Sequence, residues 1–266
     1  MTASPTAAPS RLRRIEPTAI GGVMSRELTM YRRFWRSTTF SSVVEPTIYL
    51  LAFGFGFGSL VSQVAGYDYV DFIGTGIVAT AVLFSSAFPG MFATFVKRKF
   101  QRTYDAVLAA PVDTEELVTA EALWIGLKAG VYGTVPMLVA IGFGLDPSPG
   151  MLLVPLIGIL TGIGFALFGI WVSGVVPSID SFGYVISAVL TPLFLVAGTF
   201  FPIDGLPDVV ARLAVLNPLY HCVELVRGAV FGFSGLHDVG HVVALLAFTA
   251  LMWVLAVRKL RSRLVD

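Results

Sequence analysis

The chain has 266 residues, of which 56% are hydrophobic and only 13% are charged, and its formal net charge is +1. Soluble domains carry about 25% charged residues, so this composition, with a mean hydropathy of +0.82, excludes an ordinary soluble globular protein. The single cysteine, Cys222, excludes an intramolecular disulfide framework and a multi-cysteine metal site. We therefore expect an all-α integral membrane protein.

The basic residues lie in three clusters. Seven of the 18 Lys and Arg residues precede Phe40, four lie within 97–102, and four lie within 258–263. Cytoplasmic loops of membrane proteins carry an excess of Lys and Arg, so we expect all three clusters in the cytoplasm. This predicts a multi-pass protein of the cell (inner or plasma) membrane with both termini cytoplasmic.

Two segments, 1–17 and 18–39, precede the predicted membrane-spanning part of the chain. Residues 1–17 begin with small residues and prolines and are predicted to be disordered, without a cleavable signal. Residues 18–39 are amphipathic at helical spacing: Ile20, Met24 and Tyr31 share one arc, and Arg26 and Arg33 lie opposite. We expect a helix in the cytoplasmic interface; a soluble helix packed on another domain is the alternative.

Six apolar segments follow, each near the ~20 residues that cross a bilayer. We predict transmembrane helices at about 40–61, 70–96, 119–143, 151–175, 182–201 and 237–257. Together they make a transmembrane domain over 40–257, followed by a basic cytoplasmic tail at 258–266. An even number of spans agrees with the charge distribution.

The stretch between the second and third predicted spans is densely charged. The sequence of 97–124 is KRKFQRTYDAVLAAPVDTEELVTAEALW, and charges at this density do not lie in hydrocarbon. Thr103–Ala110 can form two helical turns ended by Pro111, and Asp113 with Glu116 resembles a capping box for the next helix. We expect a short helix that stands off the membrane; an ordinary solvated loop is the alternative.

A second irregular stretch, Phe201–Phe233, lies on the predicted outer side. Pro202, Pro207 and Pro218 divide it into two short amphipathic helices. It is too apolar for a free loop and too interrupted to span. Irregular backbone at membrane depth survives only against protein or a water-filled cavity, so we expect a re-entrant pair of helices.

These stretches carry a resemblance to a family. VEPTIYLLAFGFGFGSL, RTYDAVLAAPVDTEELVTAEALW and AGTFFPIDGLP…LNPLYHCVELVRG resemble, in order, the motifs of ABC-2-type transporter permeases, in the branch of nodulation-factor (lipo-oligosaccharide) and daunorubicin-type drug exporters. The resemblance covers about Thr18 to Arg258; Ala120 departs from it, since family members often have Gly there.

The resemblance implies a permease that works with partners. These would be a second permease copy (a homodimer, or a close paralogue), two ABC ATPase subunits that bind ATP and Mg, and membrane lipids. Nucleic acid is not implied. The substrate would be amphipathic: a glycolipid, a lipo-oligosaccharide or polysaccharide, or a hydrophobic drug.

The resemblance also implies roles for two sets of residues. Those expected to couple the chain to the ATPase are Thr103, Tyr104, Asp105, Val107, Leu108, Pro111 and Glu116. Those expected at the outer gate or re-entrant region are Phe201, Pro202, Pro207, Asn217, Pro218, Tyr220, Glu224 and Arg227.

The residues themselves give three further expectations. No G-x-x-x-x-G-K-[ST] loop occurs in the sequence, so we expect no cofactor in this chain and energy supplied by another protein. Gly54 and Gly58 form a G-x-x-x-G pattern suited to helix packing. Glu45 and Lys128 are intramembrane charges that could pair, although Lys128 can also extend to the headgroups.

An enzymatic function is the alternative. A stand-alone polytopic membrane transferase could use Glu45, Glu224 or the three histidines, His221, His237 and His241. Catalysis needs convergent groups, whereas these are predicted near opposite faces, without a metalloprotease-type spacing; we expect no catalytic or metal site and interfacial positioning of the histidines. An ATPase encoded beside this chain would favour the transporter.

Overall fold

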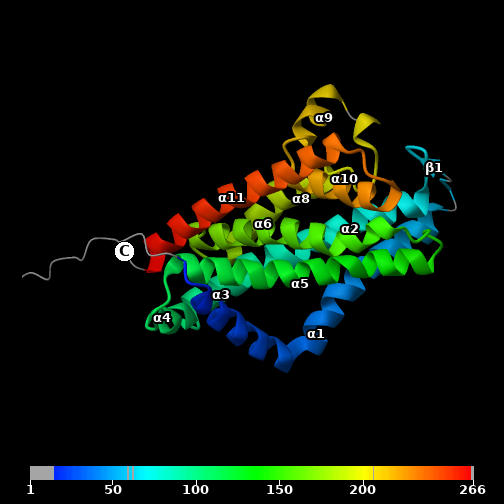
Figure 1. The fold of residues 1–266 in the computed structure, drawn as a ribbon. Coiled ribbons are helices and arrows are strands. Elements are labelled where there is room, and N and C mark those ends of the chain that lie inside the picture. The colour runs from blue at the N-terminus through cyan, green and yellow to red at the C-terminus, as the bar shows by residue number, and fades with distance from the viewer. Residues whose placement is uncertain (1–14, 59, 62, 206, 265–266) are drawn as a thin grey trace, which may run out of the picture.

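The computed structural model describes residues 15–58, 60–61, 63–205 and 207–264, without the side chains at 38, 41, 42, 45, 46, 55, 204, 208, 210 and 211. The predicted disorder of the first residues falls mostly outside this range. The described chain is a bundle of helices that lie alongside one another, with a small hairpin at one end (Figure 1). It is all-α apart from that hairpin, as the composition predicts.

The elements follow in chain order. The α-helices are α1 (Pro17–Gly58), α2 (Tyr69–Phe88), α3 (Thr94–Lys99), α4 (Thr103–Leu108), α5 (Thr114–Gly142), α6 (Val154–Val175), α7 (Phe182–Val185), α8 (Thr191–Leu195), α9 (Asp208–Ala214), α10 (Pro218–Phe231) and α11 (Leu236–Leu264). Short 3₁₀ or π segments are η1 (Pro89–Ala93), η2 (Pro149–Leu153), η3 (Ile179–Ser181), η4 (Ile186–Leu190) and η5 (Ile203–Gly205). The antiparallel hairpin joins β1 (Gln63–Val64) to β2 (Tyr67–Asp68), with Gln63 opposite Asp68.

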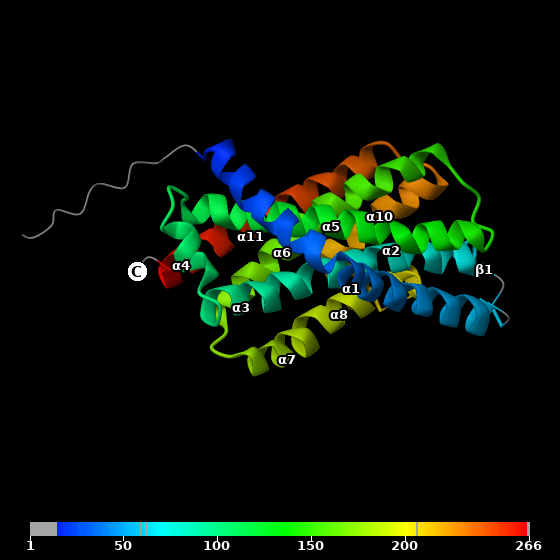
Figure 2. The ribbon, with the colours of Figure 1, turned by 90° about the horizontal axis from the view of Figure 1, so that it is seen from below.

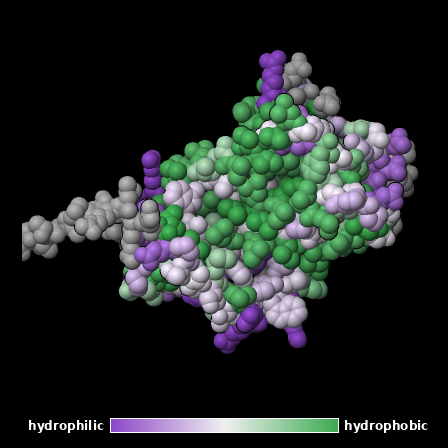
Figure 3. Space-filling view, in the orientation of Figure 1, coloured by the Kyte–Doolittle hydropathy of each residue, from purple (hydrophilic) through white to green (hydrophobic). Residues whose placement is uncertain are grey.

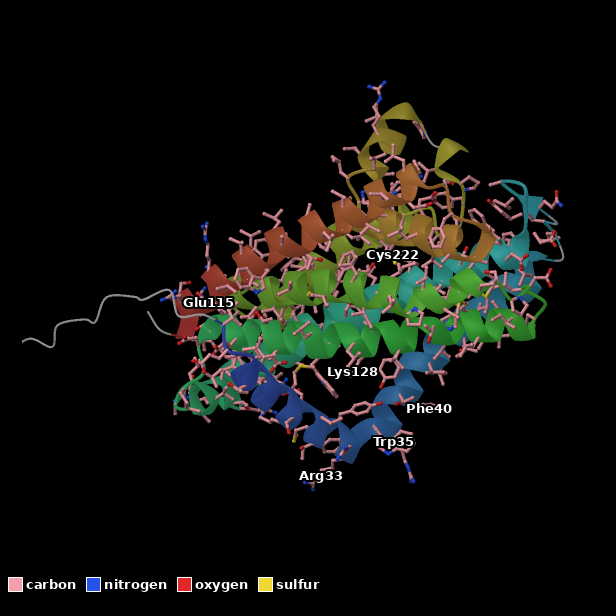
Figure 4. The ribbon with its side chains drawn as sticks, in the orientation of Figure 1. Arg33, Trp35, Phe40, Glu115, Lys128 and Cys222 are labelled. Carbon is pink, nitrogen blue, oxygen red and sulfur yellow. The ribbon has the colours of Figure 1, made fainter. Side chains whose placement is uncertain are left out.

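Helix α1 runs through both of the first two predicted segments. It is a single helix of 42 residues, and it bends between the labelled residues Trp35 and Phe40 (Figure 4). Its first limb leans away from the bundle and its second limb returns alongside it. A hydrogen bond of 2.9 Å between the Tyr31 and Tyr132 hydroxyls ties the first limb to the middle of α5.

Four helices of the described chain are long and apolar enough to cross a membrane. They are Tyr69–Lys99, Thr114–Gly142, Pro149–Val175 and Leu236–Leu264. The other two predicted spans correspond to shorter apolar helices, Thr47–Gly58 and Ile179–Leu195. The fifth predicted span ends at Leu195 rather than near 201, and Gly198, with φ +79, allows the backbone to turn just beyond it.

Close helix packing occurs at α5 and α6. A Cβ on Gly130 would lie 2.7 Å from the Pro155 carbonyl oxygen, and one on Gly162 would lie 3.2 Å from Gly126 Cα. Small residues let the two backbones approach. By contrast, a Cβ on Gly54 would meet nothing within 4 Å among the described residues. Within the described residues, close packing occurs at Gly126, Gly130 and Gly162, and a packing role for Gly54 stays a prediction.

The two ends of the bundle differ. One end brings together the start of α1, the ends of α3 and α11, and α4 (Figure 2). The other carries the hairpin, α9 and α10. Between them, the face seen in Figure 3 is mainly hydrophobic. We call the first end, built by 16–27, 94–121 and the ends of α6 and α11, the platform.

Candidate functional site

Helix α4 lies at the tip of the platform. It begins after Arg102, whose φ of 48 lies in the left-handed region, and this turns the chain sharply away from α3. It ends at Leu108, three residues before Pro111. The short helix predicted from the sequence is therefore present, held between a left-handed residue and a proline.

Tyr104 is buried inside the platform. Its side chain is only 1% exposed and packs in a cluster with Val23 and Leu117. Burial, with the nearby Glu121 carboxylate, raises the pKa of Tyr104 well above its usual value, so the phenol stays neutral. The residue was expected to contact a partner as an apolar anchor, but in this structure it anchors α4 to its own chain.

The outward surface of α4 is formed by other residues. Val107 and Leu108 are partly buried and pack on the same cluster as Tyr104, and Thr103 is half-buried. Asp105 and Pro111 are exposed. A partner that meets the tip would thus contact Asp105 and Pro111, together with the exposed alanines Ala106, Ala109 and Ala110.

A groove of about 410 Å³ lies beside this surface. Val107, Pro111 and Val112 form one wall, and the start of α1, including Val23, forms the other. The groove is mostly apolar, with Glu16 and Arg26 in its lining. It is suited to receiving an apolar projection flanked by charge.

Glu116 fixes the base of the platform. Its carboxylate accepts a hydrogen bond from the Asp113 amide at 2.9 Å, the carboxylate half of the predicted capping box, and another from the Glu16 amide at 2.7 Å. Glu116 is 2% exposed. One carboxylate thus joins the start of α5 to the start of α1, and its role here is internal.

A buried ionic network underlies α4. Lys97 Nζ lies 2.8 Å from Glu27 of α1 and 2.8 Å from both carboxylate oxygens of Glu121 of α5. Arg26 also pairs with Glu27, at 2.7 Å. The Glu121 and Glu27 side chains are 2% and 9% exposed, so each charge depends on its partner. The two basic and two acidic groups balance.

Glu27 was not identified from the sequence, although a signal was present. At 100° per residue it falls between Val23 and Ile20, on the apolar face that continues through Tyr31 and Met24. A carboxylate in the middle of an apolar helix face needs a buried partner. That partner is Lys97, which the sequence showed only as part of a basic cluster.

Arginines close the end of α6 at the platform. Arg98 donates to the Ser173 carbonyl at 2.6 Å, and Arg263 of α11 donates to the Gly174 carbonyl at 3.1 Å. Basic side chains satisfy the free carbonyls of a helix C-terminus in this way. Glu115, which lies beside the end of α11 in Figure 4, pairs with Arg261 at 3.5 Å.

At the opposite end, Asn217 and Arg227 connect α10 to its surroundings. Asn217 caps α10 by accepting from the Leu219 amide at 2.9 Å, and it donates to the Leu193 carbonyl at 2.7 Å. Arg227 pairs with Glu224 at 3.2 Å, donates to the Gly198 carbonyl at 2.7 Å, and lies 4.0 Å from the centre of the Phe72 ring.

The other residues expected at the outer gate lie at helix starts, on the surface or around a pocket. Pro207 is the N-cap of α9, and Pro218 is the first residue of α10. Phe201 is 40% exposed. Pro202 and Tyr220 are half-buried, and both line a pocket with Glu224.

The remaining expected residues are Lys128, Glu45 and Gly58. Lys128 Nζ lies 5.7 Å from the centre of the Trp124 ring, on the side of α5 that faces α1 (Figure 4). The Glu45 side chain lies outside the described residues. Their pairing stays a prediction. Gly58 makes ordinary contacts with Tyr69 and Val70.

Comparison with known proteins identifies a family. Residues 18–231 match the model of the family described as ABC-2 type transporter. Nodulation protein J of Sinorhizobium fredii (strain NGR234) is 33% identical over 236 residues, 87% of this chain and 90% of that protein. Nodulation protein J of Rhizobium leguminosarum bv. trifolii is 31% identical over 254 residues, 93% and 97% of the two chains. The inner membrane transport permease YadH of Escherichia coli K12 is 28% identical over 250 residues, 90% and 95%.

Proposed function

Because this chain belongs to the ABC-2 type transporter family and is a transport permease, we propose that it forms the membrane path of an exporter driven by a separate ATPase. The sequence contains no P-loop of its own. ATP and Mg would be bound by the partner subunit. Export then depends on a contact that carries movement from the ATPase into the helices.

The observation that carries this proposal is the construction of the platform. An exposed tip at Asp105, and a groove beside it, rest on the buried network of Lys97, Glu27 and Glu121. That network joins α1, α3 and α5 directly. A push on α4 would therefore reach α1, α3 and α5 through buried, paired side chains.

We propose six membrane spans, with the second limb of α1 and Ile179–Leu195 completing the four long helices. Six spans return both chain ends to one side, and the basic residues near 97–102 and 258–263 support a cytoplasmic side for the platform. The helix pair α9 and α10 would then re-enter the membrane from outside. A second permease copy would complete the path.

We propose an amphipathic substrate: a glycolipid, a lipo-oligosaccharide or polysaccharide, or a hydrophobic drug. A row of phenylalanine rings supports this, because seven of its nine members are exposed or partly exposed, whereas Phe182 and Phe95 are buried in the core. Successive ring centres lie 4.6 to 6.1 Å apart, and the row runs through Phe57, Phe53, Phe200, Phe194, Phe84, Phe88, Phe92, Phe182 and Phe95. Aromatic faces stack on sugar rings and on flat drugs alike.

A charge reversal at the tip tests the function. Asp105→Arg should lower co-purification of the ATPase and ATP-driven export by at least about tenfold, equivalent to 1.4 kcal/mol of binding energy. The matched control is Asp146→Arg, since Asp146 is also exposed and lies in the loop at the other end. Normal ATPase binding and export by Asp105→Arg would refute the proposed role of the tip.

A further inference from the structure

All three histidines of the chain meet at the end of the bundle opposite the platform. His221 Nδ1 of α10 lies 2.7 Å from His241 Nδ1 of α11. His241 Nε2 lies 3.2 Å from His237 Nδ1, one turn earlier on α11. The sequence places these residues apart and suggests only interfacial positions for them. The structure makes them one hydrogen-bonded row across the contact between α10 and α11.

The row runs from an exposed end to a buried middle. His237 is exposed and borders a pocket of about 230 Å³, while His241 is 5% exposed. The side chains around the row come from α10, α11, α2 and α6. Glu224 and Arg227 of α10 and Asp238 of α11 carry charge; Tyr220 presents its ring to His241. Helix α2 contributes the Phe72 ring under Arg227, and α6 contributes Thr161 beside Cys222.

The row has a definite proton capacity. A hydrogen bond between two imidazole nitrogens holds one proton, because one nitrogen must donate and the other accept. Three neutral imidazoles carry three protons: one in each of the two contacts and one on an outer nitrogen. A fourth proton can occupy the other outer nitrogen, and both hydrogen bonds persist. A fifth must enter a contact, where two N–H groups would face each other between like charges.

We propose that the three histidines form a proton-operated latch between α10 and α11, which tolerates one added proton and opens when it takes up a second. The nitrogens face one another in pairs rather than a common point, and no metal-holding group is found among the described residues. Opening would loosen α10, which also holds the turn at Gly198 and the end of α8 through Arg227 and Asn217. Acid on that side would therefore release the outer part of the bundle.

The native cysteine reports the latch directly. Cys222 is fully buried in α10, next to His221 in sequence, and faces the bundle (Figure 4). The probe is dithiodipyridine, applied to the permease in lipid nanodiscs between about pH 8 and about pH 4, a range that extends well below the ordinary imidazole pKa because two protons must be added. The reference is Cys222→Ala/Leu236→Cys, because Leu236 is 87% exposed at the start of α11, just before the predicted span, and would show the reagent's own pH dependence.

The latch predicts that Cys222 reactivity, divided by that of the reference, rises at least about tenfold on acidification. In His241→Gln, which removes the shared imidazole, the ratio should stay constant with pH. A wild-type ratio independent of pH, or an equal rise in His241→Gln, overturns the proposal.

A second measurement keeps the test decisive if His241→Gln does not fold. With only three histidines, ¹⁵N-histidine NMR of the untagged wild-type chain can follow each imidazole. The first proton should bind without any change in Cys222 reactivity, and the change should accompany the second. A rise in reactivity with the first proton, or three independent titrations, would contradict the latch.

Discussion

Replacing Lys97 with Met tests the ionic network that supports the platform. The substitution keeps the apolar stem and removes the charge that lies 2.8 Å from both Glu121 oxygens. Glu121, at 2% exposure, then loses the partner that the structure gives it, while Glu27 keeps Arg26. Removing one member of a buried ion pair costs about 3–5 kcal/mol. We expect Lys97→Met to lose that much free energy of unfolding.

Double and single variants separate charge from packing. Lys97→Met/Glu121→Gln removes both charges and should recover most of the loss, because neither leaves an unpaired buried charge. Glu27→Gln should cost less than Lys97→Met, since Lys97 retains its two contacts with Glu121. The free energy of unfolding is measured by detergent titration in mixed micelles.

Two results would refute this reasoning. Lys97→Met could lie within about 0.5 kcal/mol of the wild type, the usual range of a surface substitution. Alternatively, Lys97→Met/Glu121→Gln could lose the sum of the losses measured for Lys97→Met and for Glu121→Gln alone, which would mean that Lys97 and Glu121 act independently.

Three other predictions follow from particular side chains. Tyr104→Phe should change the free energy of unfolding by less than about 0.5 kcal/mol up to neutral pH, whereas Tyr104→Ala should cost about 3–5 kcal/mol by analogy with Phe. Because the pKa of Tyr104 is raised in the folded chain, its contribution to the free energy of unfolding is complete below about pH 10 and is lost as the pH rises above that value. Unfolding measured at increasing alkaline pH should show this loss in the wild type and not in Tyr104→Phe. Gly130→Ala should lose about 1–3 kcal/mol through its clash with Pro155, and Gly54→Ala, where the added Cβ meets open space, should lose much less; detergent unfolding compares them. Leu213→Cys, on an exposed apolar face of α9, should resist an impermeant thiol reagent in membranes and react in detergent, and rapid labelling in both would exclude a re-entrant α9.

Prolines and helix-capping residues in the sequence correctly predicted where several helices begin and end. Pro111 and the Asp113–Glu116 pair placed the break before α5, and Pro207 and Pro218 placed the starts of α9 and α10. Hydropathy located the long apolar helices to within about five residues, except that α11 continues to Leu264, well beyond the predicted end at 257. The end of the fifth span was missed, because the turn at Gly198 depends on one backbone conformation.

Contacts between distant segments could not be predicted in the same way. A tyrosine has an apolar ring and a polar hydroxyl, so Tyr104 could equally well contact a partner or pack inside its own chain. Only the tertiary structure shows that it is buried. The pairing of Glu27 with Lys97 joins residues 70 positions apart, and no local pattern encodes that register. The meeting of His221 with His241 likewise depends on how α10 folds back against α11.

The central claim is that the tip of α4 seats a separate ATPase. A photo-crosslinking amino acid at position 105 tests it most directly, because Asp105 is exposed and its neighbours hold α4 in place. On irradiation in cells, we predict one main product, in which this chain is joined to an ATP-binding protein, and no such product from the same group at position 146. Equal crosslinking from both positions, or a product at 105 with lipid or with another copy of this chain alone, would contradict the account.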